Sequence, residues 1–207
     1  MLTADELKKL LAELTGVYRV MVFVAATTGL RVSELLALRW QDCDFEAGEI
    51  RLTRGIVRQR ETMMKTEASR KPVPLDAGLA DVLMQWRAEC AYNQPSDYLF
   101  ASPEKDGKQP MWPNSAMEKH IRPAAIRVGI GKRIGWHMFR HTFGTLVKSQ
   151  GADVATTQAL MRHANVSVTM DRYVQAVTPA KRAAQRRIVG LLDPCGPTRE
   201  AGSTASN

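Results

Sequence analysis

The sequence predicts a mainly helical protein with one small antiparallel β-sheet, an α+β fold. Leucines recur at helical spacing near the start of the chain, at positions 7, 10, 11 and 14. Around residues 50–57, apolar residues separated by glycine and later by proline favour two or three short strands. Helical patterns return over residues 137–149, 153–161, 166–173 and 179–191. A chain of 207 residues with 44% hydrophobic residues can bury a substantial core.

The first three helices have local start or stop signals. Thr3 and Glu6 match the T-x-x-E capping box, and Leu2 and Leu7 lie at the staple positions. The segment "VYRVMVFVAATTG" predicts a mostly buried helix that ends at Gly29. A short third helix is expected over residues 33–38.

The middle of the chain mixes helices, strands and loops. Asp76 can cap a helix that carries Leu79, Leu83 and Trp86. Residues 97–102, "DYLFAS", predict a short strand, and Asn114 can cap a helix running to about residue 128. Residues 192–207 have the composition of a disordered tail.

Positive charge is concentrated in two blocks. Residues 51–71 carry 7 basic and 2 acidic side chains and residues 119–153 carry 7 and 1, against 5 and 8 in residues 1–50. Such an asymmetry is typical of a polyanion binder, although a basic protein kept soluble by its charge explains the composition equally well. No stretch resembles a membrane span or a signal peptide. Three widely spaced cysteines predict neither a disulfide framework nor a zinc site and fit a reducing cytoplasm.

The segment "HMFRHTFGT", residues 137–145, raises two chemical alternatives. His137 and His141 have the i, i+4 spacing of zinc ligands, but residue 138 is methionine rather than glutamate and Arg140 would repel a cation. Cleavage of a phosphodiester without metal needs arginine forks, a proton donor and a nucleophile. Arg31, Lys65, His137, Arg140, His163 and Tyr173 supply these groups.

Four motifs in order resemble the tyrosine recombinases, or phage-type integrases. They are "TGLRVSELLALRW", Lys65 in an expected hairpin, "HMFRHTFGT", and "LMRHANVSVTMDRY", in which Tyr173 follows His163 by ten residues. The resemblance covers about residues 1–191, corresponding to the family's catalytic domain, followed by the tail 192–207. Family members usually carry a separate helical DNA-gripping domain before the catalytic one, and none is visible here. Arg162 stands where a glycine is common, and we interpret it as a tolerated substitution.

The resemblance implies a role for each site residue. Arg31 and Arg140 would clamp the scissile phosphate, and His163 would donate a hydrogen bond to a phosphate oxygen. Tyr173 would attack to give a 3′-phosphotyrosyl enzyme. Lys65 would protonate the leaving 5′-oxygen, and His137 would assist proton movement. Glu34 would orient the site, and His141 would have a supporting role at most. No metal and no cofactor is implied.

The expected function is therefore site-specific recombination or integration of DNA, of the kind encoded by phages and mobile elements. The expected partner is double-stranded DNA, on which the protein would assemble as a tetramer in the cytoplasm, at the nucleoid, with accessory DNA-bending proteins as further candidates. Two alternatives stay open. Residues 153–174 are compatible with a helix-turn-helix regulator without catalysis, and a type IB topoisomerase-like enzyme would relax DNA with the same chemistry.

Overall fold

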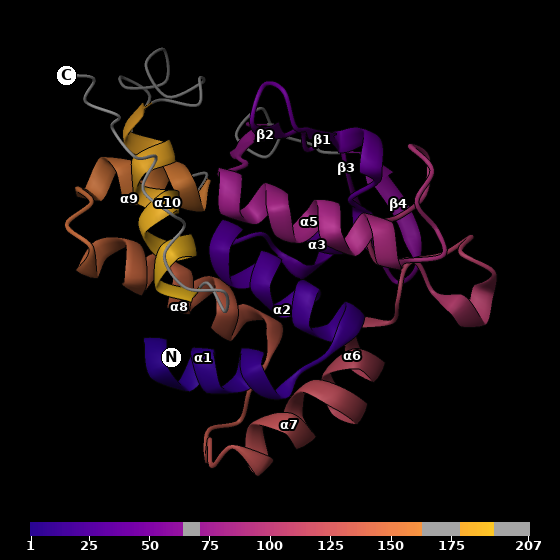
Figure 1. Cartoon of the computed structure of the whole chain (residues 1–207), viewed down its shortest axis with the longest axis horizontal. Helices are drawn as coiled ribbons and strands as arrows, with labels where there is room; N and C mark the ends of the chain where they lie inside the picture. Colours follow the sequence, from indigo (N-terminus) through magenta and orange to yellow (C-terminus); the bar gives the residue numbers. More distant parts are fainter. Residues whose placement is uncertain (64–70, 163–178, 193–207) are drawn as a thin grey trace, which may run out of the picture.

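The first helix, α1 (Ala4–Glu13), begins as its capping box predicts. The Thr3 hydroxyl accepts a hydrogen bond from the Glu6 amide at 3.1 Å, and the Glu6 carboxylate accepts one from the Thr3 amide at 2.7 Å. Leu7, Leu10, Leu11 and Leu14 are all buried, as their spacing predicts. The computed structural model describes residues 1–63, 71–162 and 179–192 (Figure 1).

The second helix, α2 (Gly16–Thr28), lies at the centre of the fold. It packs against α1, α5 (Ala77–Glu89), α8 (Trp136–Ser149) and α10 (Pro179–Leu192). Every residue from 20 to 28 is buried, as expected of a helix that is apolar on all sides. The hydroxyls of the two threonines at its end donate hydrogen bonds within the helix. Thr27 donates to the Phe23 carbonyl oxygen at 2.8 Å, and Thr28 donates to the Val24 carbonyl oxygen at 2.6 Å. The helix ends at Gly29 in the left-handed conformation, as predicted.

The C-terminal helices cover one end of this central helix. The helix α8 packs on α2, and α9 (Val154–Met161) and α10 both pack on α8 (Figure 1). The Asp153 carboxylate caps α9 by accepting the Thr156 amide at 2.6 Å. These three helices confirm the helical patterns at 137–149, 153–161 and 179–191, whereas the pattern at 166–173 lies outside the described residues.

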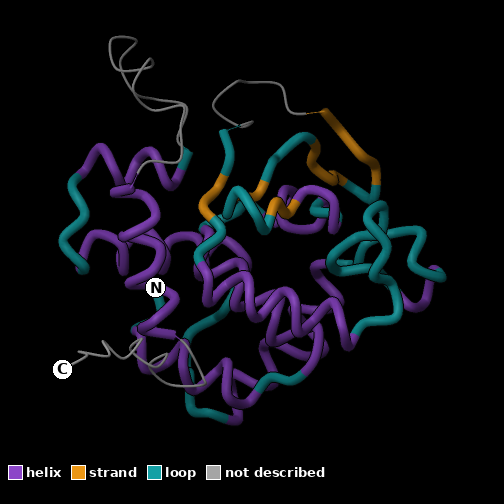
Figure 2. The backbone as a smooth tube through the Cα atoms, turned by 45° about the horizontal axis from the view of Figure 1, so that its top comes forward, coloured by secondary structure: helices purple, strands orange, loops and turns teal. Residues whose placement is uncertain are grey.

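The described strands form two small antiparallel sheets rather than the one that the sequence predicted. Strands β1 (Cys43–Asp44), β2 (Glu49–Ile50) and β5 (Val73–Pro74) pair in the order β1-β2-β5. Strands β3 (Arg54–Val57) and β4 (Arg60–Met63) form a separate hairpin, and β3 packs on the short helix α3 (Val32–Ala37). Only residues 51–53 separate β2 from β3, so a short connection joins the two sheets. Both sheets lie along one edge of the helical body (Figure 2).

Lys65 falls between β4 and β5, outside the described residues. The β3–β4 hairpin reverses at Arg58 and Gln59, whose φ angles of 50° and 60° suit a two-residue turn. The strands that flank Lys65 belong to different sheets. Lys65 thus lies between two strands, as expected, while the turn expected at Lys65 itself lies outside the described residues.

In the middle of the chain, the expected strand is wrong, and the expected helix is confirmed with a different start. Residues 97–102 form isolated bridges, Arg39 with Tyr98 and Ala101 with Pro110, because their backbone groups bond to separate segments and to the Trp86 indole instead of to one strand. The helix expected from Asn114 begins one residue earlier, at a proline that suits the first helical position. It comprises α6 (Pro113–Ala116), a π-helical turn (Met117–Ile121) and α7 (Arg122–Arg127). Short 3₁₀ turns (Trp40–Asp42 and Pro103–Lys105) complete the described elements.

Candidate functional site: a buried arginine cluster

Arg31 and Glu34 are positioned by the start of α3. Arg31 is the N-cap residue of this helix, and Glu34 is its third residue. Glu34 Oε2 accepts the Arg31 backbone amide at 2.8 Å, as glutamate does at this position of a capping box, and Glu34 Oε1 accepts Arg31 Nη1 at 3.0 Å. The Glu34 side chain is 3% exposed and that of Arg31 is 38% exposed. The arginine therefore reaches solvent while the buried carboxylate holds one side of its guanidinium.

Arg140 lies buried in α8 and joins two other elements. Its Nη1 donates to the carbonyl oxygen of Gly29, just after α2, and its Nη2 donates to the carbonyl oxygen of Met161, at the end of α9. Burial, followed by the charges of Arg31 and Arg162, lowers the pKa of Arg140 to about 10, while Glu34 acts in the opposite direction. This guanidinium is thus fixed in place but poorly compensated in charge.

Arg162 is the residue of this cluster that the sequence did not identify. It is the C-cap of α9, with φ 49° and ψ 47°, and its buried side chain donates from Nη2 to Glu34 Oε2 at 2.5 Å. The left-handed backbone explains why glycine suits this position, and beyond being a tolerated substitution the arginine side chain forms an ion pair with Glu34. Two signals point to it in retrospect: a basic residue at the end of a helix without other charged residues, and its position directly before His163.

The cluster has the charge and the partial exposure that an anion site needs. Burial raises the pKa of the Glu34 carboxyl, but the charges and hydrogen bonds of Arg162 and Arg31 outweigh this and leave the pKa below its usual value. Three guanidinium groups and one carboxylate leave a net charge of +2. A partly exposed cation backed by buried ones favours a bound phosphate, which guanidinium groups bind with matched geometry.

The histidines of α8 lie apart from the buried arginine. His137 and His141 are both exposed, with ring centroids 6.5 Å apart, as expected one helical turn from each other. Neither imidazole is hydrogen-bonded to another side chain in the described ranges. His137 and Arg140, expected on a shared face, differ in burial, because α8 turns Arg140 towards α2 and α9 and leaves His137 in solvent.

The structure therefore brings together Arg31, Glu34 and Arg140 of the predicted site, and adds Arg162. Lys65, His163 and Tyr173 lie outside the described residues. His163 follows Arg162 directly in the chain.

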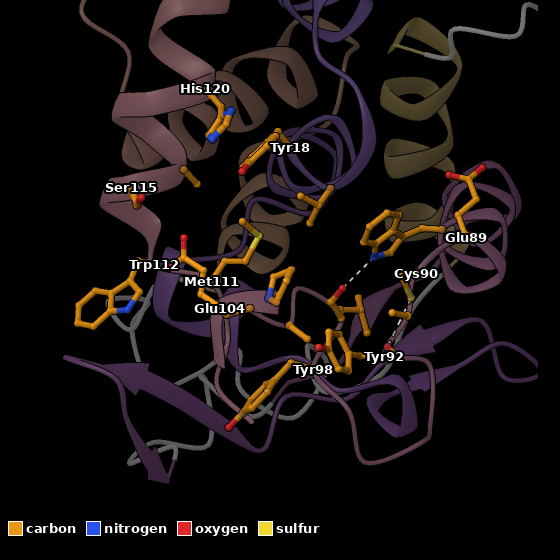
Figure 3. Close-up of a pocket in the computed structure, with 18 of the residues that line it drawn as sticks. Tyr18, Glu89, Cys90, Tyr92, Tyr98, Glu104, Met111, Trp112, Ser115 and His120 are labelled. Carbon is orange, nitrogen blue, oxygen red and sulfur yellow. Dashed lines mark hydrogen bonds between the residues drawn. The ribbon is translucent and has the colours of Figure 1, made fainter. Parts of the chain in front are cut away.

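A separate cavity of about 620 Å³ lies beside α2, α5 and α6 (Figure 3). Its lining is mixed and includes the aromatic residues Tyr92, Tyr98 and Trp112. The rings of Tyr18 and His120 stack in it with centroids 3.8 Å apart. The residues of the arginine cluster do not line this cavity, so the cluster and the cavity are distinct features of the described chain.

None of the helices in the described ranges has the length and apolar character needed to cross a membrane.

Comparison with known proteins identifies the family. Residues 1–178 match the phage integrase family. A tyrosine recombinase of Pseudothermotoga lettingae is 35% identical over 141 residues, which are 68% of this chain and 43% of that protein. Tyrosine recombinase XerA of Thermococcus onnurineus is 28% identical over 198 residues, 93% of this chain and 64% of that protein.

Solved structures give the same fold. The integrase of mycobacterium phage Brujita matches with a TM-score of 0.64 at 24% identity, over 96% of this chain and 60% of that one. The Tn1549 transposon integrase, solved in complex with circular intermediate DNA, matches with a TM-score of 0.67 at 21% identity, over 90% of this chain and 66% of that one. The chain spans about half the length of the curated relatives it matches, for example 43% and 53%. It belongs to the phage integrase family, in which these relatives are tyrosine recombinases and integrases.

Proposed function

We propose that this chain is the catalytic domain, over residues 1–191, of a site-specific DNA recombinase that cuts and rejoins DNA by transesterification. The observation that carries the proposal is the cluster of Arg31, Arg140 and Arg162 around Glu34, with its net positive charge and one partly exposed guanidinium. Family membership supports it, as do relatives solved with DNA, including the Tn1549 integrase and XerH recombinase bound to its difH substrate.

In the proposed reaction, Arg31 and Arg140 hold the scissile phosphate and stabilise the charge that develops on it. The Tyr173 oxygen attacks phosphorus, and the bond from phosphorus to the 5′-oxygen breaks. Lys65 gives its proton to this leaving oxygen, which departs as a 5′-hydroxyl, while His163 donates a hydrogen bond to a phosphate oxygen.

Rejoining reverses these steps with the 5′-hydroxyl of another strand. A tyrosine has an ordinary pKa of about 10, so its attack near neutral pH needs the nearby cations or a base such as His137. The reaction exchanges one phosphoester for another and therefore needs no nucleotide cofactor. The proposed partner is double-stranded DNA bound by a tetramer, with accessory DNA-bending proteins as further partners. We assign His141 a supporting role in the site.

A covalent trap tests the proposal. The protein is incubated with a library of nicked duplexes whose short 5′-hydroxyl fragment diffuses away after cleavage, then denatured in detergent. DNA that stays attached to the protein is sequenced, and Tyr173→Phe is the matched control. We expect adducts with the parent protein and none with the variant, with the recovered sequences converging on one site. Adducts that persist in Tyr173→Phe would contradict the assignment of the nucleophile.

Two further arms separate the alternatives. Relaxation of supercoiled plasmid that lacks the recovered site would favour a topoisomerase, whereas a recombinase requires the site. Binding without adducts, also after a helical DNA-binding domain is fused before Met1, would favour a regulator. Much of the segment that a helix-turn-helix needs lies outside the described residues, while the end of α9 faces Arg140 and Glu34 in the interior.

A further inference from the structure

The end of α9 joins both arginines proposed to hold the phosphate. The Met161 carbonyl accepts a hydrogen bond from Arg140. The next residue, Arg162, donates to Glu34, which in turn holds Arg31. Two successive residues at the end of α9 therefore contact two other helices: Met161 contacts α8, and Arg162 contacts α3.

Glu34 divides its two oxygens among three donors. Oε1 accepts Arg31 Nη1, and Oε2 accepts both the Arg31 amide and Arg162 Nη2. The Arg162 and Glu34 side chains are 2% and 3% exposed. Solvent therefore screens their interaction weakly. The three donors together hold the Glu34 carboxylate in one orientation.

Arg162 raises the net positive charge of the cluster that contains Arg31. Without Arg162, Arg31 would be the only arginine of the cluster bonded to the buried Glu34 carboxylate, and the cluster would carry a net charge of +1. With Arg162, the carboxylate shares its charge between two guanidinium groups, and the net charge is +2. A phosphodiester carries one negative charge, and a second develops as the nucleophile adds to phosphorus, so the larger net charge favours the transition state over the bound substrate.

The backbone at this position makes the side chain's contribution easier to isolate. With φ 49°, Arg162 adopts the left-handed conformation, which is strained for residues with a Cβ and free for glycine. Replacing Arg162 by glycine removes the guanidinium while suiting the backbone. A loss of activity in that variant therefore reports on the side chain rather than on an unfavourable turn.

We propose that Arg162 is a positioning residue of the phosphate site, which holds Glu34 and leaves the Arg31 guanidinium free to bind and stabilise the scissile phosphate. This inference rests on the proposed function for its role in cleavage, but its effect on anion binding can be measured without cleavage. The side chain of Arg162 is buried, so it acts through Glu34 and through its charge, and not by touching the DNA.

The first arm measures cleavage. Single-turnover adduct formation on the duplex recovered by the covalent trap is compared for the parent, Arg162→Gly, Arg162→Lys and Glu34→Gln. Arg162→Gly should slow the step by at least about tenfold while changing the duplex Kd less than about threefold. Arg162→Lys keeps the charge but has no planar fork, and it should slow the step about three- to tenfold.

A double-mutant cycle checks that Arg162 acts through Glu34. In a Glu34→Gln background, Arg162→Gly should slow the step by less than about threefold, because the link is already broken. Effects that multiply in the double variant, or a parental rate in Arg162→Gly, would overturn the inference. If Arg162→Gly does not fold, Arg162→Lys decides, and a parental rate there overturns it.

The second arm uses inorganic phosphate and needs no activity. The rise in Tm in phosphate buffer over sodium chloride at equal ionic strength reports anion binding to the folded state. Arg162→Gly should lose at least about half of the parental rise. The matched control is Arg127→Ala, which removes a surface arginine with an equally short ion pair to Glu13 and should keep the rise.

The two arms distinguish failure of this inference from failure of the proposed function. A smaller phosphate effect in Arg162→Gly together with no adducts in the parent would keep Arg162 as part of an anion site and reject the recombinase. Adducts in the parent, with rate and phosphate effect unchanged in Arg162→Gly, would keep the recombinase and reject the role of Arg162.

Discussion

The Arg140 guanidinium donates to the carbonyl oxygen of Gly29, the residue at which α2 ends. This contact ties the position of a proposed phosphate-binding group to the backbone of a turn 111 residues earlier in the chain. Gly29 has φ 63°, and a Cβ built on it would overlap the ring of Phe143, which is buried one helical turn after Arg140. The turn that carries Arg31 and the helix that carries Arg140 therefore meet at a residue without a side chain.

We expect Gly29→Ala to lower the free energy of unfolding by about 2–4 kcal/mol, because it adds left-handed strain to overpacking against Phe143. Urea unfolding measures the change. The control is Gly131→Ala, whose Cβ would meet nothing within 4 Å and which should change the stability by less than about 1 kcal/mol. Equal stability of the two variants would show that the turn can relax around an added methyl group.

The elements that the sequence predicted well are those with local signals. Thr3, Asp76 and Asp153 cap their helices with their own side chains, and Gly29 ends α2, because each of these interactions spans only a few residues. The strand expected at residues 97–102 was wrong because a strand needs a partner, and the backbone groups there bond to several distant segments.

The same distinction explains what was missed in the site. Arg31 and Glu34 lie three residues apart and could be identified from a motif. Arg162 acquires its role from an ion pair with Glu34 across 128 residues; local signals can draw attention to Arg162, but they do not identify this partner. His137 and Arg140 share a motif, yet their different burial depends on how α8 packs against α2 and α9.

Glu34→Gln should destabilise the protein near neutral pH by about 2–4 kcal/mol, because it leaves the buried Arg162 guanidinium without its carboxylate. The pKa of Glu34 lies below its ordinary value of 4.5 in the folded protein. Its ionised form therefore contributes stability that is fully present above pH 4.5 and is lost as the pH falls through the lower folded pKa. Urea unfolding at a series of pH values should show the difference between parent and variant narrowing below about pH 4.5.

The control for this measurement is Glu118→Gln, which removes the charge of an exposed carboxylate 3.8 Å from Arg122. Such a surface pair should change the stability by less than about 0.5 kcal/mol. A Glu34→Gln difference that stayed constant down to low pH would mean that hydrogen bonding, and not charge, accounts for the contribution of Glu34.

Tyr98→Phe should loosen the β3–β4 hairpin. The Tyr98 hydroxyl donates to Glu61 Oε1 on β4 at 2.6 Å, and Arg39 Nη2 donates to the same oxygen at 2.5 Å. The variant removes the bond to Glu61 and also a 3.4 Å bond that the hydroxyl accepts from Arg39 Nη2. The free energy of local opening should fall by about 1 kcal/mol, which corresponds to roughly fivefold faster exchange of the β4 amides. Hydrogen-exchange mass spectrometry measures this change.

The stacking of Arg39 over the Tyr98 ring at 4.8 Å should survive in phenylalanine, so the variant isolates the hydroxyl. Tyr92→Phe is the control, since the Tyr92 hydroxyl makes no hydrogen bond with the described residues. Equal exchange in both variants would assign the anchoring of β4 to Arg39 alone.

DNA binding should weaken steeply with salt. The charge of +8 and the two basic blocks place many cations where phosphates can bind, and each neutralised phosphate releases counterions. A plot of log K against log salt should be linear, and Arg31→Ala should reduce its slope by about one unit if Arg31 contacts a phosphate. Fluorescence anisotropy with a labelled duplex measures both slopes, and an unchanged slope would place Arg31 away from the DNA.

Lys65→Ala tests the proposed acid most directly. Loss of a general acid should slow strand cleavage about 10²–10⁴-fold with little change in binding, because the 5′-oxygen must then leave without a proton. A duplex with sulfur at the 5′-bridging position leaves readily as a thiolate and should restore most of the rate. Lys71→Ala, in the same basic block, is the matched control and should cleave both substrates at rates close to those of the parent. If the sulfur substrate fails to rescue Lys65→Ala, Lys65 holds the DNA or the site in another way, and the proton comes from a different group.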